Sequence, residues 1–97
     1  INISADKGKP VFAIESGKIV YAGNEIQAFG NLVLIKHYNN KTSAYAHLDK
    51  INVKKGESVN KGEIIALVGN SGKVSIPQLH FEIRDNNGPL DPLKYLP

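Results

Sequence analysis

The sequence predicts an all-β protein, built as a mostly antiparallel sandwich or flattened barrel. Short segments rich in β-branched and aromatic residues recur along its 97 residues, and Gly, Asn and Pro separate them. No segment keeps the 3.6-residue apolar period of an amphipathic helix. An α/β fold, in which strands alternate with helices, is therefore not expected.

Four strands are expected in the first half of the chain. Residues 11–14 (Val-Phe-Ala-Ile) and 18–22 (Lys-Ile-Val-Tyr-Ala) are short runs of strand-forming residues. Residues 31–37 and 42–48 have the same character and flank Asn39-Asn40-Lys41, whose composition is typical of a hairpin tip.

Two more strands are expected in the second half, over residues 63–68 and 78–84. Gly69-Asn70-Ser71-Gly72 opens a loop between them, and Asn86-Asn87-Gly88 closes the last strand. The chain contains no internal linker and no low-complexity segment. We therefore expect residues 1–97 to form one domain, the C-terminal part of a longer protein.

Composition narrows the classes of function. The net charge is +3, and the lysines are spread along the chain instead of forming a basic arm, so no nucleic-acid partner is expected. A solvated basic surface explains this charge, with help in binding an anionic wall polymer as the alternative. Cysteine is absent, which suits an exported protein without disulfides and a cytosolic protein equally. No apolar run approaches the roughly 20 residues that span a bilayer.

Two short motifs carry the candidate functional residues, Tyr45-Ala46-His47-Leu48 and Pro77-Gln78-Leu79-His80-Phe81-Glu82. Side chains alternate between the two faces of a strand, so Leu79, Phe81 and Ile83 are expected to point into the core. The alternate positions then share a polar surface. We expect that surface to contain Ser43, Tyr45, His47, Gln78, His80 and Glu82.

These motifs resemble those of the LytM or lysostaphin-type zinc endopeptidases of bacterial cell walls. The chain also matches that family at Ile1-Asn2-Ile3-Ser4 and at the ending Asp91-Pro92-Leu93-Lys94-Tyr95-Leu96, so the resemblance covers its whole length. The resemblance implies that the polar surface is the substrate groove of the peptidases, with Asn2 at its floor.

The departures from the family pattern bear on catalysis. Asn2 stands where the family has a zinc-binding Asp, and Gln78 stands where it has a catalytic His. His80 matches a zinc ligand, and the third ligand of the family would precede Ile1. An amide lacks the negative charge that helps to hold a divalent cation, and a glutamine cannot titrate. We therefore predict no bound zinc or other cofactor and no catalytic residue.

Residues 89–97 and the segments Tyr21-Ala22-Gly23 and Phe29-Gly30-Asn31-Leu32 resemble NlpD-like domains more than lysostaphin, so the chain is similar to the degenerate members of the EnvC and NlpD type. It implies a non-catalytic regulator that binds and activates N-acetylmuramoyl-L-alanine amidases of the periplasm during cell-wall remodelling and division. Peptidoglycan is a further expected partner, and the protein is expected to be exported, with membrane anchoring left open. The binding groove is predicted to contain Asn2, Tyr45, His47, Gln78 and His80. The alternatives are an active zinc endopeptidase with unconventional ligands and a simple peptidoglycan-binding module.

The three histidines have simpler interpretations. His37 has no partner motif and is expected to be structural or solvated. His47 and His80 have a structural alternative too, as hydrogen-bonded groups on a polar sheet face.

The run from Lys54 to Ile65 resembles the hammerhead strands of biotinyl and lipoyl carrier domains. However, Lys50 directly follows the His47 motif and does not lie at a hairpin tip between two similar halves, so carrier function is not expected.

Overall fold

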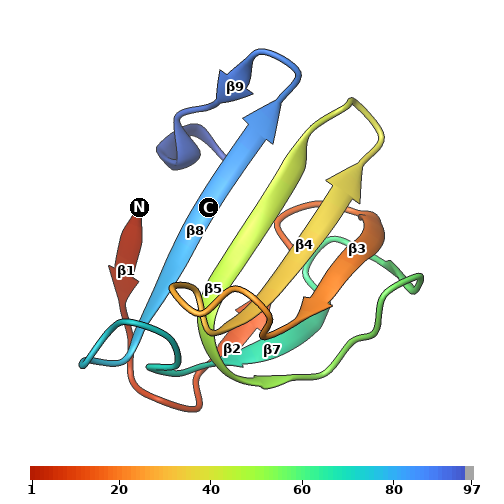
Figure 1. The fold of residues 1–97 in the computed structure, drawn as a ribbon. Coiled ribbons are helices and arrows are strands. Elements are labelled where there is room, and N and C mark those ends of the chain that lie inside the picture. Colours follow the sequence, from red (N-terminus) through yellow and green to blue (C-terminus); the bar gives the residue numbers. More distant parts are fainter. Residues whose placement is uncertain (96–97) are drawn as a thin grey trace.

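The computed structural model describes residues 1–95 and shows one continuous antiparallel β-sheet of nine strands (Figure 1). Leu96, the end of the terminal motif, and Pro97 lie outside the described residues. The strands are β1 (Asn2–Ser4), β2 (Pro10–Phe12), β3 (Gly17–Gly23), β4 (Asn31–His37), β5 (Thr42–Ile51), β6 (Ser58–Val59), β7 (Ile64–Val68), β8 (Gln78–Asp85) and β9 (Gly88–Pro89).

The predicted fold class, all-β and mostly antiparallel, is confirmed. Each of the six expected strands is present, and the longer ones agree with the prediction to within three residues at either end. The sequence analysis did not find strands β1, β6 and β9, which have two or three residues each, or the 3-10 turn η1 (Pro92–Lys94). Elements this short contain too few side chains to show a period.

The sheet folds over on itself because β5 changes partners along its length. Its first half, Thr42 to Ala46, pairs with β8, while Leu48 to Ile51 pair with β7. The main path runs β1-β8-β5-β4-β3-β6, and β7 joins β2 to the second half of β5. β2 and β7 therefore form a second layer beside the long strands (Figure 1).

The hydrophobic core fills the space between these two layers. Val11 of β2 and Ile65 of β7 belong to the same buried cluster as Ile35 of β4 and Phe81 of β8. Tyr45 of β5 joins it with 1% of its surface exposed, and its ring centroid lies 5.5 Å from that of Phe81.

No helix among residues 1–95 has the length and hydropathy of a membrane span.

A chain of hydrogen bonds crosses one end of the core. His37 Nδ1 lies 2.9 Å from the Ser16 carbonyl oxygen, which only accepts, so this nitrogen carries the proton of a neutral ring. Ser43 Oγ then donates to His37 Nε2 at 2.8 Å, and the Tyr45 hydroxyl donates to Ser43 Oγ at 2.8 Å. The Tyr45 oxygen in turn accepts from the backbone N–H of Ile14 at 3.1 Å. His37 is 5% exposed and has the structural role expected of it.

This network predicts a loss of stability in alkali. Burial raises the pKa of Tyr45, and its hydrogen bonds with Ser43 and with the backbone of Ile14 offset only part of that rise. The folded pKa thus lies above the unfolded value of about 10, so stability is complete below about pH 10 and falls as pH rises through the folded pKa. Urea denaturation across this range should show a steeper loss for the parent than for Tyr45→Phe.

Tyr38→Phe is the matched control for that measurement, because Tyr38 is 91% exposed. It should keep the slope of the parent. Equal slopes for the parent and Tyr45→Phe would show that the ionisation of Tyr45 is not coupled to folding.

Candidate binding groove

A β-bulge in β5 brings the two candidate histidines onto one face of the sheet. Val33 pairs with Tyr45 and Asn31 pairs with Leu48, so Ala46 and His47 together oppose the single residue Leu32. The extra residue is His47, whose φ of +64° lies in the left-handed region. Tyr45 and Leu48 both face the core, while His47 turns to the outer side with Ala46.

His47 is held in one orientation by the loops around it. Its backbone N–H donates to the Phe29 carbonyl oxygen at 2.8 Å. Its ring Nδ1–H donates to the Ser71 carbonyl oxygen at 2.9 Å, which leaves Nε2 as the acceptor nitrogen of a neutral ring. The side chain is 6% exposed, so both the tautomer and the ring position are fixed by the fold.

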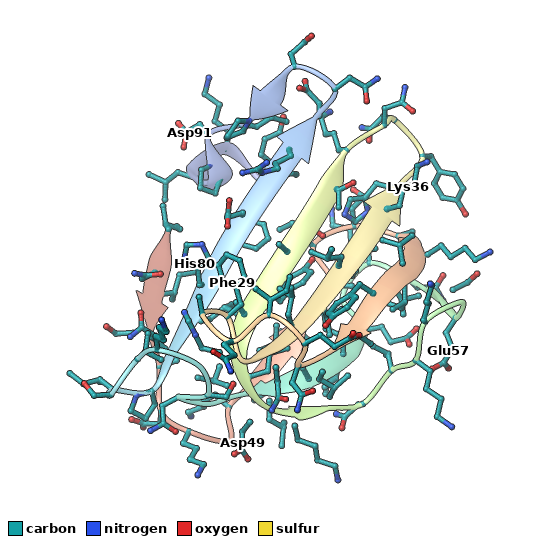
Figure 2. The ribbon with its side chains drawn as sticks, in the orientation of Figure 1. Phe29, Lys36, Asp49, Glu57, His80 and Asp91 are labelled. Atoms are coloured by element: carbon teal, nitrogen blue, oxygen red, sulfur yellow. The ribbon has the colours of Figure 1, made fainter. Side chains whose placement is uncertain are left out.

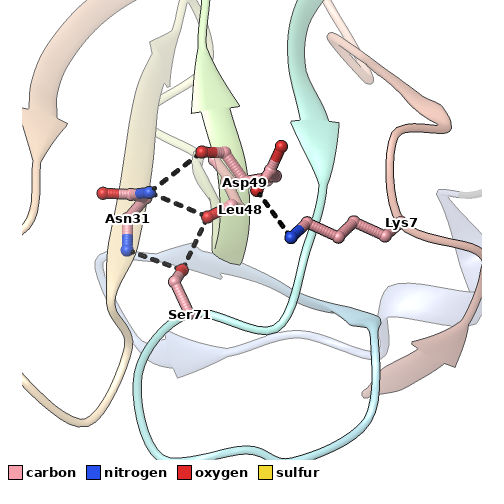
Figure 3. A network of polar contacts seen from close by, with 5 residues as sticks. All are labelled: Lys7, Asn31, Leu48, Asp49 and Ser71. Atoms are coloured by element: carbon pink, nitrogen blue, oxygen red, sulfur yellow. Dashed lines mark hydrogen bonds and ion pairs between the residues drawn. The ribbon is translucent and has the colours of Figure 1, made fainter.

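The loop between β3 and β4 is latched to the loop after β7 (Figure 3). Ser71 Oγ donates to the Leu48 carbonyl oxygen at 2.6 Å and accepts from the Asn31 backbone N–H at 3.0 Å. Asn31 Nδ2 donates to the carbonyl oxygens of Leu48 at 2.9 Å and Asp49 at 3.3 Å. The Asp49 carboxylate also lies 3.5 Å from Lys7 Nζ, an exposed pair that adds little. The latch closes the end of the sheet where β5 changes partners.

His80 stands between an amide and a carboxylate. Its Nδ1 lies 2.5 Å from Asn2 Oδ1, and its Nε2 lies 2.9 Å from Glu82 Oε2. A protonated ring donates to both oxygens. In a neutral ring Nε2–H donates to Glu82, and the Asn2 amide, turned over, donates its NH₂ to Nδ1. Glu82 also lies 3.7 Å from Arg84.

Phe29 completes the group on the outer face. Its ring lies next to that of His80 (Figure 2) and is stacked on it, with centroids 5.9 Å apart. The centroid of the His47 ring is 6.5 Å away. The two imidazoles are 6.1 Å apart and nearly perpendicular. The sequence analysis missed Phe29 because it lies in a loop, outside any alternating pattern. An aromatic residue beside Gly30-Asn31 was its only signal.

The groove continues from these rings along the outer face of β5, with a volume of about 330 Å³. Ala44 and Ala46 form its floor, because their side chains are the smallest on this face. Leu34 of β4 lines one side, and Glu82 of β8 lines the other. The groove thus has one apolar wall and one charged wall.

Not every predicted groove residue lies there. Residues directly opposite each other on antiparallel strands share a face, and Tyr45 is opposite Phe81 while Ser43 is opposite Ile83. Both side chains are therefore buried in the core, and their predicted place on the polar surface is wrong. The prediction continued the alternation of β5 through His47 and so missed the bulge. Asn2 is also not at the floor, since it lies exposed on the edge strand β1.

Gln78 is half-buried and shares the face of His80 by strand alternation. Its side-chain amide donates to the Ile76 carbonyl oxygen at 3.2 Å. Among residues 1–95 no hydrogen bond joins Gln78 to either groove histidine. The structure therefore brings His47 and Asn2 next to His80, which alone of the three lines the groove, and leaves Gln78 at the margin.

Within residues 1–95, the donors around His80 do not make up a catalytic zinc centre. Such centres use three protein ligands drawn from His, Cys, Asp and Glu, with one position open for water. Within the described part of the chain, no group of three or more such residues could hold a metal ion. At His80 the neighbours are the neutral amide of Asn2 and one carboxylate.

The fold and this site define the class of protein. The sequence profile of Peptidase family M23 matches residues 1–92, so the chain belongs to that family. The catalytic domain of lysostaphin from Staphylococcus simulans superposes with a TM-score of 0.91 at 35% identity, over 97% of this chain and 74% of that one.

Three relatives place the chain more closely within the family. It is 45% identical over 97 residues to the uncharacterized lipoprotein YgeR of Escherichia coli and 47% identical over 103 residues to the cell division protein DipM of Caulobacter vibrioides. It is 43% identical over 97 residues to the murein hydrolase activator NlpD of Escherichia coli. All of this chain is covered, but it spans only 38%, 17% and 25% of those proteins.

The contact between the two latched loops can be tested at Gly30. A methyl group there would overlap Ser71 and the Gly72 nitrogen, and φ of Gly30 is +63°. Gly30→Ala should lower the free energy of unfolding by at least about 1–2 kcal/mol and shift the ring proton resonances of His47 and His80 in NMR spectra. Gly8→Ala is the control, because Gly8 also has a positive φ but has nothing within 4 Å. Unchanged histidine resonances in a folded Gly30→Ala protein would show that the contact between the two loops does not position the rings of His47 and His80.

Proposed function

We propose that this M23 domain is a non-catalytic regulator that binds a peptidoglycan amidase in the groove and activates it. One observation carries the proposal: Asn2 holds His80 through a neutral amide, in a site whose donor set does not fit a catalytic zinc ion. The names of the relatives NlpD and DipM, a murein hydrolase activator and a cell division protein, support a regulatory role.

The remaining groups suit binding better than hydrolysis. A glutamine amide donates and accepts hydrogen bonds but exchanges no proton, and Gln78 makes its bond to the backbone of Ile76. His47 has a fixed tautomer, with Nε2 as its acceptor, but needs an activated nucleophile for chemistry. An apolar floor beside an aromatic ring and a few charges is, by contrast, typical of a binding site.

Activation would follow from differential affinity. An amidase exchanges between a blocked state and an open state, and a regulator that binds the open state more tightly shifts the population toward it. A tenfold preference provides about 1.4 kcal/mol of coupling. In our proposal the groove captures an amidase segment that otherwise covers the amidase's own active site.

The cellular setting belongs to the same proposal. YgeR is named a lipoprotein, so we place this domain in the bacterial envelope, on the periplasmic side where peptidoglycan is found. Peptidoglycan itself is a second proposed partner. The rival function is a zinc endopeptidase, which the close superposition on the lysostaphin catalytic domain favours.

Metal content and hydrolysis separate these two functions. Full-length protein dialysed against about micromolar zinc should retain well under one equivalent by elemental analysis, because too few anionic or imidazole donors surround His80. It should release no dye from labelled sacculi, and Gln78→His alone should not change that. Asn2→Asp combined with Gln78→His is the minimum plausible rescue. Wall release by the unmodified protein that is abolished by His80→Ala would establish the endopeptidase instead.

Groove variants test the binding surface. His80→Ala, within the groove, should weaken binding of a cognate amidase by about tenfold, or 1.4 kcal/mol, and reduce its stimulation, because a few central residues dominate most interfaces. Gln78→Lys should do the same by placing a long charged side chain at the groove margin. Asn86→Lys, a matched amide-to-lysine change in an exposed turn, should have little effect. Circular dichroism provides the folding control. If folded groove variants stimulate the amidase as well as the parent does, partner binding uses another surface.

A further inference from the structure

A second candidate site lies on the opposite face of β8 from the groove. It consists of two adjoining cavities, a cleft of about 600 Å³ and a smaller pocket of about 260 Å³. Four residues line both cavities: Ile14, Lys61, Lys94 and Tyr95. The two cavities therefore form one continuous site, and nothing in the proposed amidase binding uses it.

The cleft is apolar. Leu79 and Phe81 of β8 line it from one side, and β2 lines it from the other through Val11 and Phe12. Phe12 is 52% exposed, an unusually open position for a large aromatic side chain. Covering such a surface removes apolar area from water and contributes about 25 cal/mol per Å².

The pocket is cationic. Lys41, Lys61 and Lys94 reach it from three separate segments, the β4–β5 hairpin, the β6–β7 turn and η1. Within the part of the chain that the structure describes, Glu15 is the only carboxylate that lines it. Among residues 1–95 none of these three lysines lies within 4.0 Å of a carboxylate, although Lys41 Nζ lies 5.5 Å from the centre of the Tyr95 ring.

The lysines supply the charge of this pocket. His37 also lines it, but both of its ring nitrogens are engaged, by Ser16 and Ser43. Converging ammonium groups with one carboxylate among them repel each other and attract an anion. Phosphate and carboxylate are the groups that three lysines recognise as point charges.

We propose that the cleft and the pocket together bind an anionic amphiphile, an acyl chain that ends in a phosphate or carboxylate. The chain would lie against Phe12, Leu79 and Phe81, and the head group would reach Lys61 and Lys94 at the boundary of the two cavities. A ligand that fits only one cavity leaves the other without a partner. An uncharged lipid provides no counter-charge for the lysines, and a small anion does not cover the apolar cleft.

Isothermal titration calorimetry with the full-length protein tests the proposal by comparing a complete amphiphile with its apolar chain alone and its charged head group alone. Dodecyl phosphate should bind, while dodecanol, which lacks the charge, and inorganic phosphate, which lacks the chain, should bind at least about tenfold more weakly. Rising salt should weaken the binding of dodecyl phosphate. Equal affinity for dodecyl phosphate and either partial ligand would overturn the proposal, as would the absence of binding.

Variants locate the binding. Lys61→Glu with Lys94→Glu should weaken dodecyl phosphate binding at least about tenfold, and Phe12→Asp should do the same by placing a like charge in the cleft. The controls carry the same changes elsewhere, Lys50→Glu with Lys55→Glu and the exposed Ile76→Asp, and should bind as the parent does. Thermal melts check the fold of each protein. Unchanged binding in both site variants would refute the assignment.

A further comparison identifies the source of the ligand. Lysophosphatidylglycerol below its micellar concentration represents a free amphiphile, and vesicles of phosphatidylglycerol or phosphatidylcholine represent a membrane. Binding of the lysolipid alone indicates a soluble ligand, and binding of both the lysolipid and the anionic vesicles indicates a lipid taken from a membrane. Binding to anionic vesicles without the lysolipid would show a charged surface without a chain site and would overturn the proposal.

Discussion

The change of partners along β5 is the constraint on which the rest of this structure depends. The first half of β5 pairs with β8 and its second half pairs with β7, so the backbone must turn between Ala46 and Leu48. The turn is made by an extra residue in a left-handed conformation, His47. Hydrogen bonds from the neighbouring loops hold it, chiefly those centred on Ser71. The position where β5 changes partners is therefore also the position that places an imidazole beside His80.

In our proposal, this coupling explains how the groove can keep its shape without catalytic chemistry. His47 and His80 are positioned by backbone geometry and strand pairing, neither of which needs a metal ion. Replacing a carboxylate by an amide at position 2 keeps an oxygen within hydrogen-bond distance of His80 while removing one negative charge. We expect such a change to cost little folding stability and to weaken metal binding, because it keeps the hydrogen bond and removes a negative charge. In our proposal it leaves a preorganised groove with apolar and polar walls, which is what a protein partner requires.

The sequence predicted what depends on local pattern. Strands of five residues or more were found, because alternation and strand-forming side chains agree in them. The sequence analysis placed Tyr45 on the wrong face of the sheet. Side chains alternate between faces only up to a bulge, and no residue type in the sequence indicates the bulge at His47. Phe29 was missed because its contact with His80 joins a loop to a distant strand. The convergence of Lys41, Lys61 and Lys94 was likewise invisible, since three turns meet only in the folded chain.

The two candidate sites lie on opposite sides of one strand and should act independently. Even-numbered residues of β8, His80 and Glu82, line the groove, and the odd-numbered Leu79 and Phe81 line the cleft. Salt screens the field of exposed charges beyond a Debye length of about 8 Å at physiological ionic strength, so any effect of the lysines on the groove through solvent should depend on salt. Any coupling between an amphiphile and a protein partner would have to travel through the packing of Phe81, which is 1% exposed and touches Tyr45 of the bulged strand.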